Sequence, residues 1–124
     1  MAYEIPGNGI GVLNAGADLS TKQYYVVKVN TSGAIILGAA TTDRPLGVLQ
    51  NNPTSGKTAS VMTSGVTKAI AGAAIAAGAQ VSCNASGQVI TAVTTSYSIG
   101  TALVAAAALG DVISISLDAG KGIV

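Results

Sequence analysis

The segment from Arg44 to Val61, RPLGVLQNNPTSGKTASV, is the part of this chain that most resembles a phosphate-binding loop. Gly56-Lys57-Thr58 matches the end of the motif G-x-x-x-x-G-K-[ST], in which backbone N–H groups and the lysine hold phosphates. The motif also requires a glycine at position 51, where this chain has asparagine, and a helix after the lysine. Because the residues after Lys57 alternate as a strand does, the sequence argues against a nucleotide site.

Other residue types that carry catalysis or bind metals are scarce. The chain has no histidine, which removes the commonest general base and metal ligand. Cys83 is the single cysteine, and its alternation with Val81 predicts a buried thiol on a strand. The acidic residues lack the spacing of a calcium loop or a carboxylate pair, although folding could bring distant ones together. They are Glu4, Asp18, Asp43, Asp111 and Asp118. We predict a protein that is not an enzyme and uses no cofactor or metal.

Two further motif matches are explained better by turns. GNGIG, at positions 7–11, lacks the full spacing of a dinucleotide-binding fingerprint and has no strand before it or helix after it. Asn30-Thr31-Ser32 and Asn84-Ala85-Ser86 match glycosylation sequons. Each is followed by glycine, a combination typical of a tight turn, so we predict turns at both places.

Few residues of the chain are charged. Six Lys and Arg and five Asp and Glu make up 9% of the 124 residues, whereas a soluble domain typically has about 25%. Such a surface is either built of small uncharged side chains or covered by other protein, and we favour the second. The net charge of +1 and the dispersed basic residues predict no nucleic-acid groove. The basic residues are Lys22, Lys28, Arg44, Lys57, Lys68 and Lys121.

Nothing in the sequence predicts export or membrane insertion. MAYEIPGNGIG lacks the basic and apolar regions of a signal peptide. The most apolar segment, Ala69–Ala79, has eleven residues and two glycines, whereas a bilayer span needs about twenty apolar residues. We therefore expect no membrane association and synthesis in the cytoplasm.

The chain contains an internal repeat with an offset of about 54 residues. NTSG at Asn30–Gly33 aligns with NASG at Asn84–Gly87, and apolar residues on either side of these turns align as well. Each copy is predicted to hold a strand, a hairpin turn, a second strand, a linker and two further strands. We place both copies in one domain spanning 16–124, with halves at about 17–70 and 71–124.

Alternating apolar residues predict which faces of the strands lie in the core. In VISISL, at positions 112–117, the Ile and Leu side chains point to one side, and the repeat predicts the same side for Ala59, Val61 and Thr63. QYYVVKV, at 23–29, is partly apolar on both faces, so one face could contact another subunit. No helical stripe persists. The predicted fold class is all-β: a small single-domain barrel or compact sandwich built from two similar halves, with little helix.

The first fifteen residues lie outside this repeat, and we predict that they form an extended arm. Glycine and proline disfavour a regular element there, yet the segment is too apolar for a solvated tail. We expect the arm to order against a neighbouring subunit or partner, and a strand packed on its own domain is the alternative. The residues expected at an interface are Tyr3, Glu4, Ile5, Pro6, Ile10, Val12, Leu13 and Tyr24.

Several segments together resemble the capsid cement, or decoration, proteins of tailed bacteriophages. These segments are ADLSTKQYYVVKVNTSG, TDRPLGVLQNNP, GVTKAIAGAAIAAGAQV, NASGQVITA and GDVISISL. The resemblance covers about Ala17–Leu117, and its most specific block is Asp43–Gln50. It implies no catalytic residues, and it implies structural glycines at Gly47, Gly65, Gly72, Gly78 and Gly110. With the two hairpin turns included, the main structural glycines are expected to be Gly33, Gly47, Gly65, Gly87 and Gly110.

The resemblance implies a protein that binds the outer surface of an assembled phage head and bridges major capsid subunits to stabilise it. Its partners would be the major capsid protein and further copies of itself, as a homotrimer or alternatively a dimer, with no nucleic acid and no membrane. It would be made in the host cytoplasm and end on the outer surface of the virion capsid. The alternative function is a head-fibre or receptor- or glycan-binding module. That role usually needs exposed aromatic side chains, and the chain offers Tyr3, Tyr24, Tyr25 and Tyr97 alone.

Overall fold

The residues that the structure describes form ten strands and no helix. The computed structural model describes residues 9–93 and 96–118. The first five strands are β1 (Gly9–Ile10), β2 (Val26–Val29), β3 (Ile35–Leu37), β4 (Gly47–Leu49) and β5 (Val61–Met62). The next five are β6 (Ser64–Ile70), β7 (Gln80–Cys83), β8 (Val89–Thr91), β9 (Gly100–Ala102) and β10 (Val112–Asp118). Over these ranges no helix exists that could cross a bilayer.

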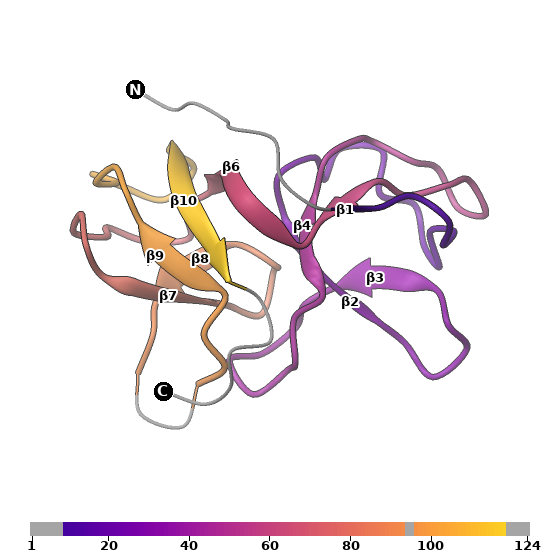
Figure 1. Ribbon diagram of the computed structural model, residues 1–124, viewed down its shortest axis with the longest axis horizontal. Helices are drawn as coiled ribbons and strands as arrows, with labels where there is room; N and C mark the ends of the chain where they lie inside the picture. The colour runs from indigo at the N-terminus through magenta and orange to yellow at the C-terminus, as the bar shows by residue number, and fades with distance from the viewer. Residues whose placement is uncertain (1–8, 94–95, 119–124) are drawn as a thin grey trace.

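The strands form two five-stranded antiparallel sheets that lie side by side and share one strand order (Figure 1). The first sheet has the order β1-β5-β4-β2-β3, and the second has the order β6-β10-β9-β7-β8. The register repeats as well, since Val29 pairs with Ile35 as Cys83 pairs with Val89. The prediction of an all-β domain built from two similar halves is confirmed.

Each sheet is closed by the segment that follows its first strand. Ala15 forms a parallel bridge with Ile35 on β3, and Ala71 forms the same bridge with Val89 on β8. In both halves the N–H of the next residue, a glycine, donates to that strand carbonyl at 2.7 Å. Because the first and last strands of each sheet are joined in this way, each half is a small barrel.

Each half surrounds its own cluster of buried apolar side chains. The first cluster consists of Ala15, Leu19, Val27, Ile35, Leu49, Ala59 and Val61. The second and larger cluster draws on β6 to β10 and the loops between them, and also on Val26 and Val48 of the first sheet. The second core is therefore completed by residues of the first half.

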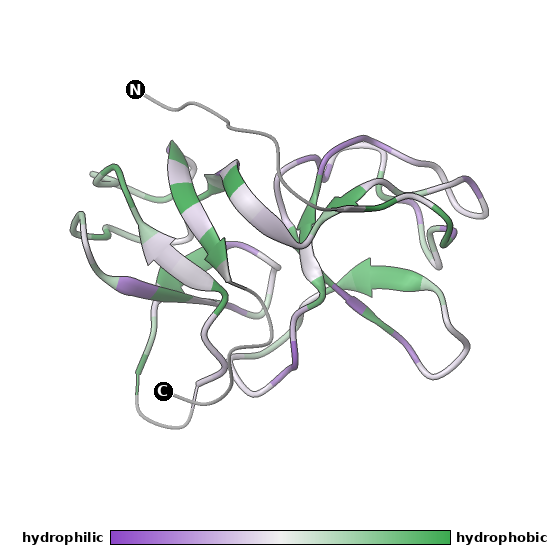
Figure 2. Cartoon of the chain, in the orientation of Figure 1, coloured by the Kyte–Doolittle hydropathy of each residue, from purple (hydrophilic) through white to green (hydrophobic). Residues whose placement is uncertain are grey.

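The predicted alternation of β10 is confirmed. Hydrophobic and polar residues alternate along the strand (Figure 2). Ile113, Ile115 and Leu117 are buried, and Ser116 is exposed. Ser114 lies on the outer face but is also buried. In the equivalent segment of the first half the expected residues Ala59 and Val61 are buried, and the third, Thr63, is half-buried.

Strand β2 is buried on both faces at Val26 and Val27 because these residues lie between the two clusters. Val26 contributes to the second cluster and Val27 to the first, and both are 0% exposed. The expectation that one face contacts another subunit is therefore corrected for the face of Val26, which the second half of the same chain covers. Val29, at the end of the strand on the other face, is 42% exposed.

The first strand of each sheet lies before the repeat boundary expected from the sequence. Strand β6 belongs to the second sheet, so the halves divide at Thr63 and not at residue 70. Likewise β1 pairs with β5, and Asn14 bridges Thr58, so residues 9–15 are part of the first sheet. Ala71 in the second half is equivalent to Ala15 in the first, so this segment repeats with an offset of 56 residues. The hairpin turns repeat with an offset of 54, and an alignment based on them therefore does not reveal the repeat of this segment.

Ile115 tests this assignment of the core. It is 0% exposed, so Ile115→Ala should lower the free energy of unfolding by about 2–5 kcal/mol through lost burial and a residual cavity. The neighbouring exposed Ser116 is the control, and Ser116→Ala should change stability by less than about 0.5 kcal/mol. Urea denaturation followed by circular dichroism measures both. Equal stability of Ile115→Ala and the wild-type protein would show that the core is wrongly assigned.

Candidate interaction surfaces

The two halves are joined by backbone hydrogen bonds that run from one barrel to the other. The Val26 N–H donates to the Gly87 carbonyl at 2.7 Å, and the Tyr97 N–H donates to the Thr41 carbonyl at 2.8 Å. Gly87 is buried, because its hairpin turn lies against the first half. The turn of the second half therefore binds the beginning of β2 and the loop after β3.

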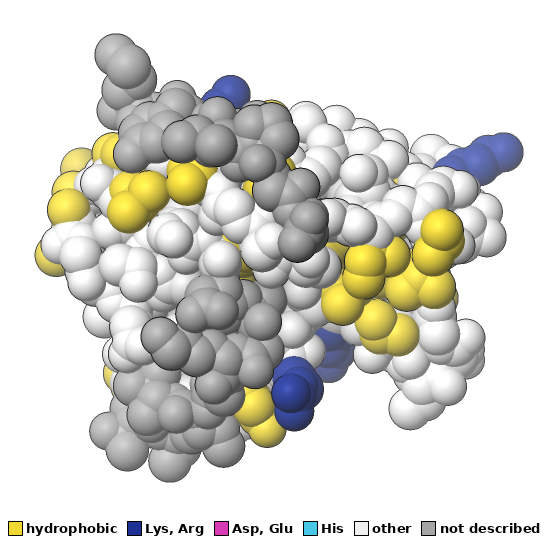
Figure 3. Space-filling model, viewed as in Figure 1, with side chains coloured by type: hydrophobic (Ala, Val, Ile, Leu, Met, Phe, Trp, Pro, Cys, Tyr) yellow, Lys and Arg dark blue, Asp and Glu magenta, His cyan; other side chains and the backbone are white. Residues whose placement is uncertain are grey.

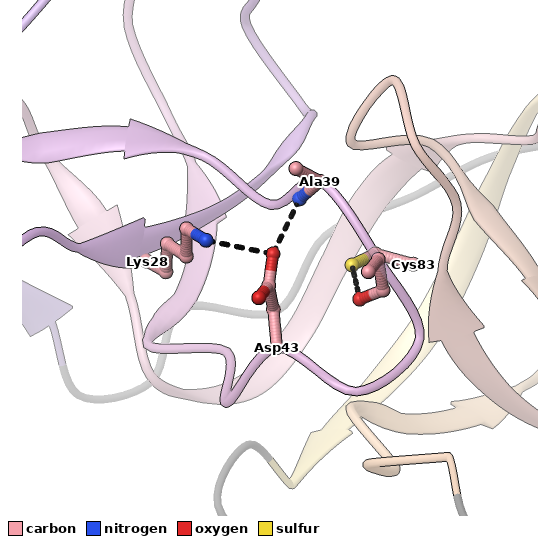
Figure 4. A network of polar contacts seen from close by, with 5 residues as sticks. Lys28, Ala39, Asp43 and Cys83 are labelled. Carbon is pink, nitrogen blue, oxygen red and sulfur yellow. Dashed lines mark hydrogen bonds and ion pairs between the residues drawn. The ribbon is translucent and has the colours of Figure 1, made fainter.

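Asp43 organises this loop of the first half (Figure 4). Its carboxylate accepts hydrogen bonds from Lys28 Nζ at 2.8 Å and from the Ala39 N–H at 2.7 Å. The bond from Lys28 is the main reason that the pKa of the Asp43 carboxyl lies below its ordinary value, although partial burial opposes the shift. Because Lys28 is on β2 and Ala39 follows β3, the carboxylate fixes the loop to the strand before it.

Cys83 lies on the other side of the same junction (Figure 4). Its thiol donates to the Ala40 carbonyl at 3.2 Å, and burial raises its pKa. The predicted buried strand thiol is confirmed. A thiol held protonated and away from solvent is a poor nucleophile, so Cys83 serves to pack the two halves together.

The segment that resembles a phosphate loop is a connection of the barrel. Lys57 is exposed and precedes an isolated bridge and β5, with no helix. Its carbonyl accepts from the Ala15 N–H at 2.8 Å, just as the Asp111 carbonyl accepts from the Ala71 N–H at 2.8 Å. Opposite charges thus stand at equivalent places in the two halves. Across residues 9–93 and 96–118, His, Cys, Asp and Glu form no group of three that could hold a metal ion.

The residues predicted at an interface from the arm fall into two groups. Tyr3, Glu4, Ile5 and Pro6 lie outside the described residues. Ile10 pairs with Val61 and is half-buried, Leu13 packs against the first cluster, and Val12 is 83% exposed. The structure brings Ile10 and Leu13 onto their own domain. Contact of the arm with a neighbouring molecule stays a prediction.

Tyr24, the last residue predicted at an interface, lies within the chain at the junction of the halves. It packs against the second cluster, and its carbonyl accepts a hydrogen bond from the Ile70 N–H at 3.2 Å. Its φ of 72° is the one positive value of a non-glycine residue among those described. Lys68 Nζ lies 5.7 Å from the centre of its ring.

All the expected structural glycines except Gly72 stand where a side chain would be strained or would overlap the backbone, whereas a Cβ on Gly72 would meet the side-chain amide of Asn84. Positive φ angles, between 75° and 109°, are found at Gly33, Gly65, Gly78, Gly87 and Gly110. Gly47 is extended, but β4 runs so close to β5 that a Cβ on Gly47 would overlap the Met62 carbonyl oxygen. Gly47 is therefore required for the close approach of these two strands.

Two loops of the second half form an exposed surface, which we call the apolar loop surface. The loops span 72–79 and 103–110 and are joined by a bridge between Ile75 and Ala106. With the start of β10, their exposed apolar residues are Ala73, Ala74, Ala76, Ala77, Leu103, Ala105, Ala107, Ala108, Leu109 and Val112. Figure 3 shows hydrophobic side chains gathered at this end of the molecule, near β9 and β10. Leu109 has the highest exposure of the large residues there, 68%.

The equivalent loops of the first half are polar. Equivalence follows from the backbone, since the Leu19 N–H donates to the Pro53 carbonyl at 2.9 Å as the Ile75 N–H does to the Ala106 carbonyl at 3.0 Å. The polar residues of these loops, at 16–23 and 50–57, are Asp18, Ser20, Thr21, Lys22, Gln23, Gln50, Asn51, Asn52, Thr54, Ser55 and Lys57. Polar side chains also bond across the two loops, as in the Gln23 N–H to Asn52 Oδ1 bond of 2.9 Å. One backbone thus presents two different surfaces.

Sequence reasoning did not identify the apolar loop surface. The run ALVAAAAL, at 102–109, lies between the last two strands expected in the second copy, but an apolar run alone does not say whether its side chains are buried or exposed. The repeat held part of the missing signal, since Leu109 stands where the first copy has Ser55. Backbone bonds add that Leu103 corresponds to Gln50, because the Leu103 N–H donates to the Ser114 carbonyl as the Gln50 N–H does to the Ser60 carbonyl. A core position is not expected to be polar in one copy and apolar in the other.

The fold is similar to that of a solved phage protein. The N base of head fibre gp8.5 of bacteriophage phi29 matches with a TM-score of 0.65 and 19% sequence identity, over 89% of this chain and 94% of that chain. At this identity the match shows the fold alone. No curated protein matches the sequence. The family model of phage cement proteins matches residues 6–117. The chain belongs to the phage cement protein family.

The family match confirms the resemblance found in the sequence. The cement protein is a structural component of a phage capsid, and the virion is its location. This role needs surfaces for other proteins, and the exposed apolar loop surface is a candidate for one of them.

The Lys28–Asp43 pair predicts how the stability of the cement protein depends on pH. Asp43→Asn should lower the free energy of unfolding at pH 7 by about 1 kcal/mol, because the pair is partly exposed and one charged hydrogen bond is lost. Folding lowers the pKa of Asp43 below its ordinary value of 3.8. The stabilisation is therefore full above that value and is lost as the pH falls through the folded pKa.

Urea denaturation at pH 7 and near pH 2 measures this effect. The difference between the wild-type protein and Asp43→Asn should shrink at the lower pH. Lys28→Met is the control at pH 7, and the double variant should cost less than the sum of the two single variants. A difference that is the same at both pH values would contradict the assignment.

Proposed function

We propose that the cement protein binds the outer surface of a tailed-phage head, where it bridges neighbouring major capsid subunits and stabilises the shell. The observation that carries the proposal is the apolar loop surface on a domain of a family of phage cement proteins. Exposed apolar patches are uncommon on soluble monomers and mark interaction sites. The apolar loop surface is the contact that we assign to the major capsid protein.

The chemistry of this surface suits a contact that is repeated many times on a shell. Most of its side chains are alanines, which let the backbone of a partner approach closely. Burial of apolar surface contributes about 25 cal/mol per Å² to the binding free energy. The small side chains of one such contact therefore give a modest affinity. Simultaneous contacts to several capsid subunits raise the overall affinity without any single strong site.

Self-association is part of the same proposal. A homotrimer is the form we favour, with a dimer as the alternative, because several copies joined together hold several capsid subunits at once. Residues 1–8 of the arm contribute to attachment in this scheme, since they carry Tyr3, Ile5 and Pro6 in an apolar stretch. The protein is made in the host cytoplasm and has no enzymatic activity.

The alternative function is a head-fibre or receptor- or glycan-binding module. The fold shared with the N base of a phage head fibre favours a fibre base. Against a glycan-binding role, the described tyrosines are all half-buried, and the chain has no Phe or Trp. Electron microscopy of virions, with density for this chain either on the shell or beneath a projecting fibre, separates the two functions.

Leu109 and Ser55 form a matched pair that tests the contact with the shell. Leu109→Lys places a charge in the apolar loop surface and should weaken binding to isolated heads by at least about tenfold, because the charge must be desolvated. Ser55→Lys makes the same change at the equivalent exposed position of the first half and should bind as the wild-type protein does. Co-sedimentation with heads that lack the cement protein measures both. Equal binding by the two variants would exclude the apolar loop surface from the contact.

Removal of residues 1–8 tests the role of the arm. The truncated protein should keep its fold, because β1 begins at Gly9, and should occupy fewer sites on the heads or form smaller oligomers. Circular dichroism checks the fold, and co-sedimentation and light scattering measure the other two properties. Unchanged occupancy and unchanged mass would reject the arm hypothesis.

A further inference from the structure

The contact between the two halves is asymmetric, because each half contributes a different surface to it. The second half presents Gly87 to the first half, where its carbonyl accepts from the Val26 N–H. A two-fold symmetric pair would repeat this contact in reverse, with Gly33 of the first half against the second. Gly33 is instead exposed, and no atom lies within 4 Å of a Cβ placed on it. The contact is therefore head-to-tail, and it leaves one binding face unused on each half.

The unused face of the first half is hollowed. A pocket of about 270 Å³ is lined by Val29, Arg44, Pro45 and Leu46. Val29 is 42% exposed, although its counterpart on the second half is the buried Cys83.

The other lining residues also have counterparts at the junction. The Leu46 N–H donates to the Val27 carbonyl at 2.9 Å as the Ile99 N–H does to the Val81 carbonyl at 2.8 Å. Leu46 thus corresponds to Ile99, and Arg44, two residues earlier, corresponds to Tyr97.

The counterpart of the pocket in the second half is filled by the chain itself. There Cys83 donates to the Ala40 carbonyl, and the Tyr97 N–H donates to the Thr41 carbonyl. The segment that fills the site follows β3 and begins at Gly38. The pocket on the first half is therefore the same site without its occupant.

The second half carries a free counterpart of that occupant. The Gly38 N–H donates to the Val26 carbonyl at 3.0 Å, and the Ala92 N–H donates to the Gln80 carbonyl at 2.9 Å. Ala92 therefore corresponds to Gly38, and Val93 corresponds to Ala39. Val93 is 59% exposed, so this segment presents an apolar side chain to solvent.

We propose that the pocket lined by Val29, Arg44, Pro45 and Leu46 binds the Ala92–Val93 segment of a second copy of this chain. The contact repeats the one between the halves, buries Val29 against Ala92 as Cys83 is buried against Gly38, and leads from copy to copy in one direction. A head-to-tail contact of this kind closes into a ring when its rotation permits. The inference deepens the proposed self-association, on which it rests, by naming the two surfaces that meet.

Disulfide cross-linking tests this geometry, because the existing junction supplies the distances. A Cβ on Gly38 would lie 3.7 Å from Cys83 Cβ and 2.8 Å from Cys83 Sγ, and disulfides need Cβ atoms about 3.5–4.5 Å apart. Gly38→Cys should therefore form a disulfide with Cys83 inside one chain, which is the positive control. Val29→Cys on one copy and Ala92→Cys on another occupy the equivalent positions between copies.

The full-length variants Val29→Cys and Ala92→Cys, each with one added cysteine, are oxidised separately and as an equal mixture. The products are separated by non-reducing electrophoresis. The mixture should give covalent dimers of Val29→Cys with Ala92→Cys, and each variant alone should give no more dimer than the wild-type protein. Dimers of Val29→Cys alone would mean a symmetric contact and would overturn the proposal. The proposal would also be overturned if the mixture gave no covalent dimer while Gly38→Cys formed its disulfide within one chain.

Self-association measured by light scattering gives a second test without cysteine chemistry. Ala92→Asp should raise the dissociation constant by at least about tenfold, because it places a charge where the junction between the halves packs Gly38 against Cys83, and Ser55→Asp should leave it unchanged. Equal dissociation constants for the two variants would reject the contact. Binding of the same proteins to heads is measured separately. If the wild-type protein binds heads but the mixture fails to cross-link, this contact alone is rejected. If the oligomers cross-link but do not bind heads, the proposed function is rejected.

Discussion

The structure depends on the burial of β2 between two cores. Val27 fills the first barrel and Val26 the second, so four residues of extended chain serve both halves. With Val48 also in the second cluster, the larger core lacks part of its lining without the first half. Neither half is a self-contained unit, although each has its own closed sheet. Two cores that share a strand are expected to unfold together, and a repeat of this kind forms one domain.

Comparison of the two halves distinguishes the features that the fold requires from those that belong to the surface. Both halves keep the same bridges, the same hairpin turns and the same close approach of strands at Gly47 and Gly100. Their loops share hydrogen-bond geometry but differ in chemistry, since Lys57 stands opposite Asp111 and Ser55 opposite Leu109. Positions that the barrel does not constrain are free to differ. The demands of folding therefore do not explain the apolar loop surface, and this is why we assign it to a contact with another protein.

Local patterns in the sequence predicted those parts of the fold that depend on local rules. The alternation of β10, the Asn-x-Ser-Gly turns and the buried thiol of Cys83 each follow from spacing of two to four residues. The role of β1 and the two-sided burial of β2 depend on which distant segment lies beside each strand, and periodicity carries no such information. The pocket beside Val29 was equally hidden, because its meaning comes from a comparison of contacts in three dimensions.

The direction of the junction also bears on why only one half carries apolar loops. If copies join head-to-tail, first and second halves alternate along the assembly, and the apolar loop surface occurs at every second barrel. The intervening loops are polar and exposed, as at Asn52 and Lys57. An assembly with identical apolar loops on all barrels would expose twice the apolar area before attachment and would aggregate more readily. Under the proposed function, divergence of the two copies thus limits the apolar area that a free copy exposes and keeps an apolar surface for the shell.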